Sequence, residues 1–211
     1  MTVRTLVLCG DCWHPPHVPL AGLEGMRGEF SLDCVDDART WSPGFLAGYS
    51  LVVLTKSNNV SAADPAPWML EEVQGALADH VRKGNGLLAV HSGTAEYENA
   101  PVLRALLGGV FAHHPEECLV DVEPRMGHAM CAGAAPFTVR DEQYFMMMDD
   151  PRLDVFLTTW SMHGEQPGGW RRGEGAGRVA VLTPGHNVDV WLHPSYQALL
   201  RNAMRWCGGM L

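Results

Sequence analysis

The sequence predicts an α/β protein of flavodoxin-like type, a three-layer sandwich with a mainly parallel central sheet. Short apolar runs with glycine or polar residues at their ends are typical of buried strands, and amphipathic helices separate several of them. Strands that alternate with helices form a parallel sheet covered on both faces, because the crossovers are right-handed. With 211 residues, 46% of them hydrophobic, the chain is expected to form one domain over residues 1–211.

The predicted strands follow from apolar runs, taken in chain order. They cover residues 5–8, 51–54, 87–90, 155–157 and 179–182. Residues 118–122 predict an additional strand. The Gly/Ala-rich residues 127–136 and the Gly-rich residues 166–177 are expected to form loops, the second of them exposed before the last core strand.

The predicted helices follow from apolar residues that recur every three or four positions. The first lies between Asp64-Pro65, a start signal, and Gly84, a stop, and its apolar face consists of Met69, Val73, Leu77 and Val81. A shorter helix around residues 102–106 is closed by Gly108-Gly109. The last helix covers residues 196–207.

Composition excludes several classes of partner. The net charge of -9 and the lack of a Lys/Arg cluster beyond Arg171-Arg172 argue against nucleic acid. No apolar run approaches the ~18 residues that cross a bilayer, so no membrane partner is expected. The apolar patch before Cys9 is too short for a signal peptide, which predicts a cytoplasmic protein. The six cysteines are therefore expected to be reduced.

Histidines follow several of the predicted strands. His91 comes directly after the apolar run at residues 86–90, and His14, His114 and His186 lie after other strands or in Gly/Pro turns. Because the carboxyl ends of parallel strands meet at one edge of a sheet, these side chains are expected to share a pocket. Imidazole there can act as acid or base, bind a hydroxyl, or ligate a metal.

The residue after His91 does not fit a covalent nucleophile. A serine elbow requires small residues two positions before and after the serine, but Val90 and Thr94 flank Ser92. No cysteine occurs at this position, which argues against thiol-based glutamine hydrolysis. Ser92 could hydrogen-bond a ligand or cap a helix.

Acidic and aromatic residues near strand ends complete the predicted site. Glu142 and Tyr144 follow the apolar segment at residues 137–139, where the carboxylate could orient a histidine or join a metal site; a solvated acidic turn is the alternative. Trp160 could stack on a sugar ring or simply pack against the core. The Cys9-x-x-Cys12 spacing leaves a redox or structural zinc role open.

Together these motifs resemble the ThuA-like (trehalose utilization) family, part of the class I glutamine amidotransferase-like superfamily. The resemblance covers nearly the whole chain and depends on the order and spacing of its motifs. The segments that carry it lie at residues 86–91, 107–115, 141–144, 177–186 and 191–194. His91 is similar to the family histidine that stands in place of the amidotransferase cysteine, and the resemblance implies a role in carbohydrate catabolism.

From these observations we predict an enzyme that hydrolyses, eliminates or isomerises a small polyhydroxylated or keto-sugar substrate. The resemblance implies that it acts in trehalose or keto-sugar utilization. The predicted catalytic residues are His91, Glu142, His114 and His186. The predicted substrate-binding residues are His14, Ser92, Trp160 and Tyr144. A divalent metal such as zinc is a candidate cofactor, with His91, His114 and His186 as ligands.

The predicted partner is a small sugar derivative, with self-association into a homo-oligomer left open. Two other functions are retained. One is a non-catalytic sugar-binding or regulatory protein on an amidotransferase-like fold. The other, residual glutaminase activity, ranks last because the thiol is missing.

Overall fold

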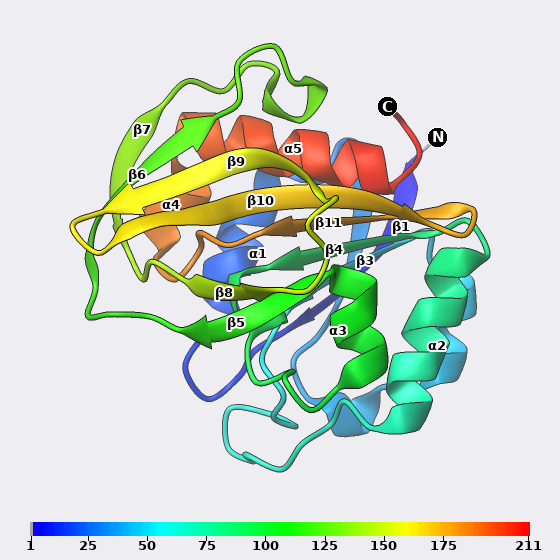
Figure 1. Ribbon diagram of the computed structural model, residues 1–211. Coiled ribbons are helices and arrows are strands. Elements are labelled where there is room, and N and C mark those ends of the chain that lie inside the picture. Colours follow the sequence, from blue (N-terminus) through cyan, green and yellow to red (C-terminus); the bar gives the residue numbers. More distant parts are fainter. Residues whose placement is uncertain (1) are drawn as a thin grey trace.

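The computed structural model describes residues 2–211 and is built on a nine-stranded mixed sheet (Figure 1). In sheet order the strands are β2 (Phe30–Val35), β1 (Val3–Cys9), β3 (Leu51–Thr55), β4 (Gly86–Val90), β11 (Gly177–Leu182), β10 (Gly164–Glu174), β9 (Asp154–Ser161), β6 (Cys118–Pro124) and β7 (Phe137–Asp141). A second sheet pairs β5 (Gly109–His113) with β8 (Phe145–Met148). All six predicted strands are therefore confirmed.

The large sheet has a parallel half and an antiparallel half. Strands β2, β1, β3, β4 and β11 pair in parallel, whereas β11, β10, β9, β6 and β7 pair antiparallel. The prediction of a mainly parallel sheet is thus wrong for the second half. Only a two-residue turn joins β10 to β11, and a parallel crossover requires a dozen or more residues.

The glycine-rich segment at residues 166–177 is not an exposed loop. Most of it forms β10, whose register with β9 shifts between Pro167 and Gly169. A Cβ atom added at Gly168 would lie 2.8 Å from Thr159 Cγ2. These glycines therefore lie in a bulged strand that packs closely against its neighbours. Glycine content alone does not distinguish such a strand from a loop.

The helices are short except for two. They are α1 (His17–Leu23), α2 (Glu71–Arg82), α3 (Pro101–Leu107), α4 (Val188–Leu192) and α5 (Pro194–Cys207). The 3₁₀ segments are η1 (Glu24–Met26), η2 (Ala38–Thr40), η3 (Pro43–Gly48), η4 (His91–Thr94) and η5 (Ala129–Cys131). The last of these interrupts the loop expected at residues 127–136. None of the helices in residues 2–211 has the length and apolarity needed to span a bilayer.

The three predicted helices are present, and one starts later than expected. Helix α2 begins at Glu71, not beside Asp64-Pro65, because Asp64 forms an isolated bridge with Ser61 and its side chain accepts from Ala66 N. Helix α3 ends at Gly108, whose φ of 79° is the left-handed conformation common after helices.

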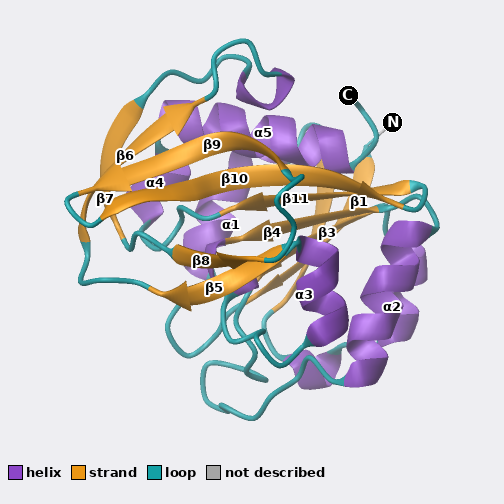
Figure 2. Ribbon diagram, viewed as in Figure 1, coloured by secondary structure: helices purple, strands orange, loops and turns teal. Residues whose placement is uncertain are grey.

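Helices cover both faces of the parallel half (Figure 2). Alternate strand residues such as Val7 and Val53 pack with α1, α4 and α5 in one apolar cluster. Their neighbours Leu6 and Val52 pack with α2 and α3 in the other. The period-two alternation of the strands therefore produces two cores, one on each side of the sheet.

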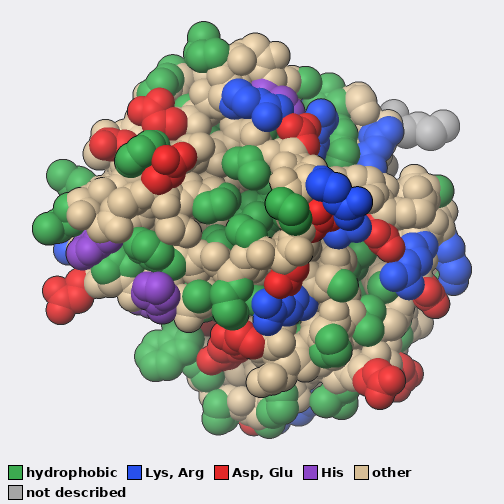
Figure 3. Space-filling view, in the orientation of Figure 1, with side chains coloured by type: hydrophobic (Ala, Val, Ile, Leu, Met, Phe, Trp, Pro, Cys, Tyr) green, Lys and Arg blue, Asp and Glu red, His purple; other side chains and the backbone are tan. Residues whose placement is uncertain are grey.

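The antiparallel half is less completely covered. Leu119, Trp160 and Met162 are exposed large apolar side chains on or next to its strands. Figure 3 shows hydrophobic side chains gathered near the centre of the face over β8, β9 and β10. The two halves thus differ in packing as well as in strand direction.

Candidate functional site

A pocket of about 560 Å³ opens at the carboxyl edge of the parallel strands. Its volume is within the ~300–1,000 Å³ typical of small-molecule sites. Residues that follow β1, β3, β4, β5, β7 and β11 contribute to it. The lining consists of Trp13, His14, Ser57, Ala95, Glu96, Phe111, His114, Glu142, Tyr144 and His186.

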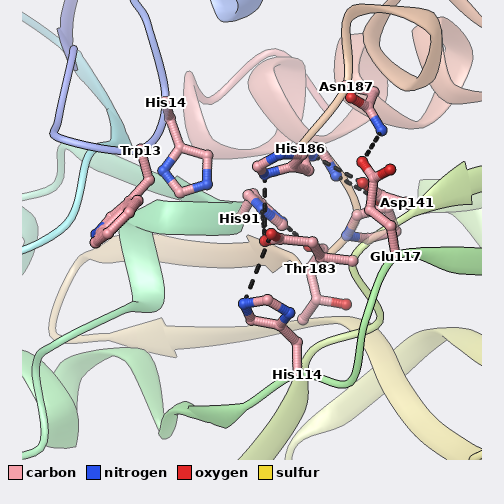
Figure 4. Close-up of polar contacts among 12 residues, drawn as sticks. Trp13, His14, His91, His114, Glu117, Asp141, Thr183, His186 and Asn187 are labelled. Carbon is pink, nitrogen blue, oxygen red and sulfur yellow. Dashed lines mark hydrogen bonds and ion pairs between the residues drawn. The ribbon is translucent and has the colours of Figure 1, made fainter.

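Four side chains converge at the base of this pocket: His14, His91, His186 and Glu142, here called the histidine cluster. One ligand atom from each lies within 4.8 Å of the others. Glu142 Oε2 is 3.5 Å from His91 Nε2 and 3.2 Å from His186 Nδ1. Figure 4 shows the three imidazoles directed toward a common point, although they come from three separate strand ends.

Hydrogen bonds fix the orientation of two of these rings. His91 Nδ1 donates to Thr183 O at 2.8 Å, and His14 Nδ1 donates to Asp11 Oδ1 at 2.8 Å. Because a carbonyl or carboxylate oxygen can only accept, the proton stands on Nδ1 in both rings. In the neutral form of each ring, Nε2 then carries the lone pair, and this nitrogen faces the cluster.

Three nitrogen atoms of the cluster are buried without a hydrogen-bond partner among residues 2–211: His14 Nε2, His91 Nε2 and His186 Nδ1. A buried polar atom without a partner is costly, and native proteins contain few of them. Two of them, His91 Nε2 and His186 Nδ1, lie 3.5 and 3.2 Å from Glu142 Oε2 without hydrogen-bond geometry. Three buried nitrogens without hydrogen bonds that meet at one carboxylate therefore indicate a ligand that binds them together.

The backbone at His91 is shaped by close contacts. His91 has φ 48°, a left-handed conformation that turns the chain sharply after β4. Two residues later, a Cβ atom at Gly93 would lie 2.0 Å from Leu54 O, so only glycine fits. Gly93, two residues after His91, thus permits the turn that brings His91 into the cluster.

Asp141, the last residue of β7, positions His186. Its two carboxylate oxygens accept from Gly185 N and His186 N, both at 2.9 Å. Burial raises the pKa of Asp141 to about 7, while these two N–H groups act in the opposite direction. The carboxylate therefore couples the loop after β11 to the strand end that carries Glu142.

The cluster combines a neutral imidazole with an ionised carboxylate. Burial lowers the pKa of His91 to about 4. Burial alone would raise the pKa of Glu142, but its contacts with His186 and His91 lower it well below the ordinary value. Contact with Glu142 raises the pKa of His186. Near neutral pH, His91 is thus available as a ligand beside a negative charge.

The donor set suits a divalent transition metal. Three imidazoles and one carboxylate are ligands that zinc and its neighbours in the first transition row accept. The converging group differs from the predicted ligand set of His91, His114 and His186, because it contains His14 and Glu142 and not His114. His114 Nε2 lies 3.6 Å from Glu142 Oε1, beside the cluster.

Most of the predicted site residues come together. His14, His91, His114, Glu142 and His186 meet as described. Tyr144 lines the pocket and stacks on His91, with ring centroids 3.9 Å apart. The six side chains therefore form one continuous site, although they come from residues as far apart as 14 and 186.

Two predicted substrate-binding residues lie elsewhere. Ser92 is fully buried within η4, does not line the pocket, and its hydroxyl has no partner among residues 2–211. Trp160 lies in β9, half-exposed and outside the pocket lining. Trp13, 70% exposed at the pocket, occupies the place expected for a stacking aromatic.

The sequence predicted no role for Asp11 or Thr183, and it indicated Asp141 only as the second carboxylate beside Glu142. Asp11 accepts from the backbone N–H groups of Trp13 and His14 as well as from the His14 ring. Burial alone would raise the pKa of Asp11, but hydrogen bonds from His14 and the backbone lower it. The place of Asp11 just after β1 was the one signal that could have found it. Thr183 contributes only its backbone carbonyl, and Asp141 holds the backbone N–H groups of Gly185 and His186. A sequence pattern reveals neither of these two roles.

The Cys9-x-x-Cys12 spacing is separate from the site. Cys9 is buried, Cys12 is exposed and contacts Ser61 O, and both are free thiols. Burial raises the pKa of Cys9 to about 12, which disfavours its thiolate.

Fold and site together define an α/β protein with a metal-compatible histidine cluster at the carboxyl edge of its parallel strands. The chain belongs to the ThuA family, described as trehalose utilisation, whose sequence profile matches residues 16–207. The curated proteins contain no match to the chain.

Solved structures show where this fold occurs. A ThuA-like protein from Parabacteroides merdae superposes with a TM-score of 0.78 at 19% identity, covering 99% of this chain and 90% of that one. A ThuA-like protein from Bacteroides uniformis gives 0.73 at 18% identity, covering 97% and 91%. A protein described as part of a GMP synthase, from Thermoplasma acidophilum, gives 0.64 at 14%, covering 99% and 96%. At these identities the likeness shows a shared amidotransferase-like fold.

Proposed function

We propose that this protein is a metal-dependent enzyme of carbohydrate utilisation that hydrolyses, eliminates or isomerises a small keto-sugar or polyhydroxylated substrate. The observation that carries the proposal is the set of three buried imidazole nitrogens without hydrogen bonds that converge with Glu142 within 4.8 Å. The carbohydrate part is supported by the family's description as trehalose utilisation. We place the activity in the cytoplasm, which the free cysteines support.

The residues of the histidine cluster would hold the metal. When bound there, a divalent ion would supply Lewis-acid polarisation of a carbonyl or hydroxyl oxygen. Asp11 and the Thr183 carbonyl keep the Nε2 lone pairs of His14 and His91 directed at the ligand position. In this arrangement His91 and Glu142, which the sequence predicted as catalytic residues, serve as metal ligands.

Proton transfer would then fall to His114. Its Nδ1 donates to Pro115 O at 2.8 Å, so Nε2 carries a lone pair. This nitrogen faces Glu142 Oε1 at 3.6 Å, and the side chain is 36% exposed in the pocket wall. A histidine with one fixed nitrogen and one free nitrogen beside the substrate space has the geometry of a general base.

Thiol chemistry is not supported by the pocket. Among residues 2–211 no cysteine lines it, and His91 occupies the turn after β4. We therefore do not assign glutamine hydrolysis to this chain.

The proposal is tested by turnover of a keto-sugar panel with protein whose metal content is measured by elemental analysis. We expect about one divalent ion per chain and activity that disappears on chelation and returns with the metal. His114→Ala should lose at least about 100-fold in turnover while keeping its metal. His17→Ala, a change of an exposed histidine outside the pocket, is the matched control. Full activity of metal-free protein would remove the metal from the proposal.

A further inference from the structure

The pocket contains a second carboxylate that the histidine cluster does not use. Glu96 lines the pocket just after η4. Its Oε2 lies 3.5 Å from Asn59 Nδ2, which also donates to Ser57 Oγ at 2.5 Å. Ser57 is itself part of the lining. Glu96 thus belongs to a polar wall separate from the four converging ligand atoms.

The backbone of Glu96 is held in an unusual conformation. Within residues 2–211, His91 at φ 48° and Glu96 at φ 62° are the only non-glycine residues with positive φ. Both belong to the same site. Bulky side chains seldom adopt this region, and such strain persists where the surroundings impose it, often at functional sites.

Buried neighbours impose this conformation from both sides. Ala95 N donates to Ser92 O at 3.0 Å, and Tyr97, fully buried, donates its hydroxyl to Lys56 O at 2.7 Å. The chain is therefore fixed before and after Glu96, while the Glu96 side chain itself is exposed to the pocket.

The remaining lining suits an uncharged ligand. Away from the histidine cluster that would hold the metal, no lysine or arginine of residues 2–211 lines the pocket, and Glu96 adds a carboxylate there. Phosphate and carboxylate groups are ordinarily recognised by arginine, lysine or helix N-termini. Trp13, Phe111 and Tyr144 add aromatic surface against which the apolar face of a sugar ring can pack.

We propose that Glu96 is a specificity-determining residue whose carboxylate accepts hydrogen bonds from hydroxyl groups of an uncharged sugar and excludes phosphorylated or acidic sugars. This inference rests on the proposed function, because it assumes that the pocket binds a sugar. It assigns to Glu96 a task distinct from holding the metal, so the two can be separated by experiment.

The test uses trehalose and trehalose 6-phosphate as a matched pair that differs in one phosphate. Binding of each to the purified protein is measured by isothermal titration calorimetry. We expect trehalose to bind at least about tenfold more tightly than its phosphate, since a like charge facing a carboxylate is strongly disfavoured. Glu96→Gln should weaken trehalose binding and reduce the preference to less than about threefold, and Glu96→Lys should reverse it.

Glu98→Gln is the control, because Glu98 is exposed, two residues away and outside the lining. Metal content and thermal midpoint are recorded for every variant, so that loss of the fold is not mistaken for loss of selectivity. Equal binding of both sugars to the wild type, or a preference unchanged in Glu96→Gln, would overturn the inference and leave the proposed function standing. Failure of the wild type to bind either sugar would overturn the inference, while the proposed function is judged separately by turnover of the keto-sugar panel.

Discussion

Two clusters of charged and histidine side chains lie at the two halves of the sheet, and they differ in how many of their polar atoms form hydrogen bonds. In the antiparallel half, Asp154 accepts from Arg125, Arg171 and His128, a group called here the Asp154 cluster. His128 uses both ring nitrogens, since Nε2 contacts Asp154 at 3.1 Å and Nδ1 accepts from Met130 N.

The histidine cluster of the parallel half has the opposite property. His14 and His91 each form one ring hydrogen bond and His186 forms none within the described residues, and each ring has a buried nitrogen without a hydrogen bond. A satisfied cluster stabilises the fold, whereas a converging, unsatisfied cluster requires something that the protein chain does not supply. The structural histidine, His128, therefore differs from the ligand histidines of the histidine cluster in its hydrogen bonds and not in its burial.

The largest effect is expected from Glu142→Gln. The amide keeps the shape of the side chain but removes the negative charge that faces His91 and His186. Divalent-metal affinity should fall at least about 100-fold, as measured by competition with a chelating dye. An unchanged affinity would show that the histidine cluster is not a metal site.

Asp11→Asn should have a smaller effect on the same measurement. Asp11 contacts no ligand position and acts through the His14 ring, which it orients by a 2.8 Å hydrogen bond. Loss of such an outer partner commonly lowers metal affinity about 10- to 100-fold. If the variant binds metal as tightly as the wild type, Asp11 serves the backbone of residues 11–14 only.

Metal affinity should also rise with pH. The pKa of His186 is raised by Glu142, so metal-free protein retains a proton on His186 at pH values where an ordinary histidine has lost it. Metal binding must displace this proton. Below the raised pKa, the metal affinity therefore falls by up to about tenfold for each unit of decreasing pH, whereas above that pKa this proton no longer affects the affinity. Calorimetry in buffers of different ionisation enthalpy should detect proton release, and its absence would contradict the assigned role of His186.

The smallest effect is expected in the Asp154 cluster. Asp154→Asn should lower the free energy of unfolding by roughly 1 kcal/mol, because the carboxylate is partly exposed and its ion pairs are screened by solvent. Burial alone would raise the pKa of Asp154, but hydrogen bonds from Arg171, Arg125 and His128 outweigh it, so the pKa lies below its ordinary value. The stabilisation is therefore fully present above the unfolded-state pKa and is lost as pH falls through the lower, folded-state pKa. Urea denaturation checks the change, and a shift in metal affinity would contradict the distinction between the two clusters.

The sequence predicted the parallel half and its histidines well. His14, His91 and His186 come after β1, β4 and β11, and the shared direction of these strands brings the three positions to one edge. The antiparallel half was harder, because the glycines of β10 form a bulged strand with the same composition as a loop. Trp160 does lie near a strand end, but strand direction in that half carries it away from the pocket.

The supporting groups could not be predicted for a different reason. Asp11 and Asp141 are ordinary acidic residues near strand ends, a pattern shared with solvated turns. Their function comes from burial and from backbone N–H groups contributed by residues distant in the sequence, as with Asp141 and Gly185. The exchange of His114 for His14 among the ligands likewise depends on side-chain direction, which residue spacing does not specify.

The central claim is that the histidine cluster binds a divalent transition metal. Its most direct test is an anomalous difference map from crystals of the protein incubated with zinc, with data collected on both sides of the zinc absorption edge. We predict one strong peak in contact with His14, His91, His186 and Glu142, and none beside the Asp154 cluster. A map without a peak among these four side chains would contradict the account.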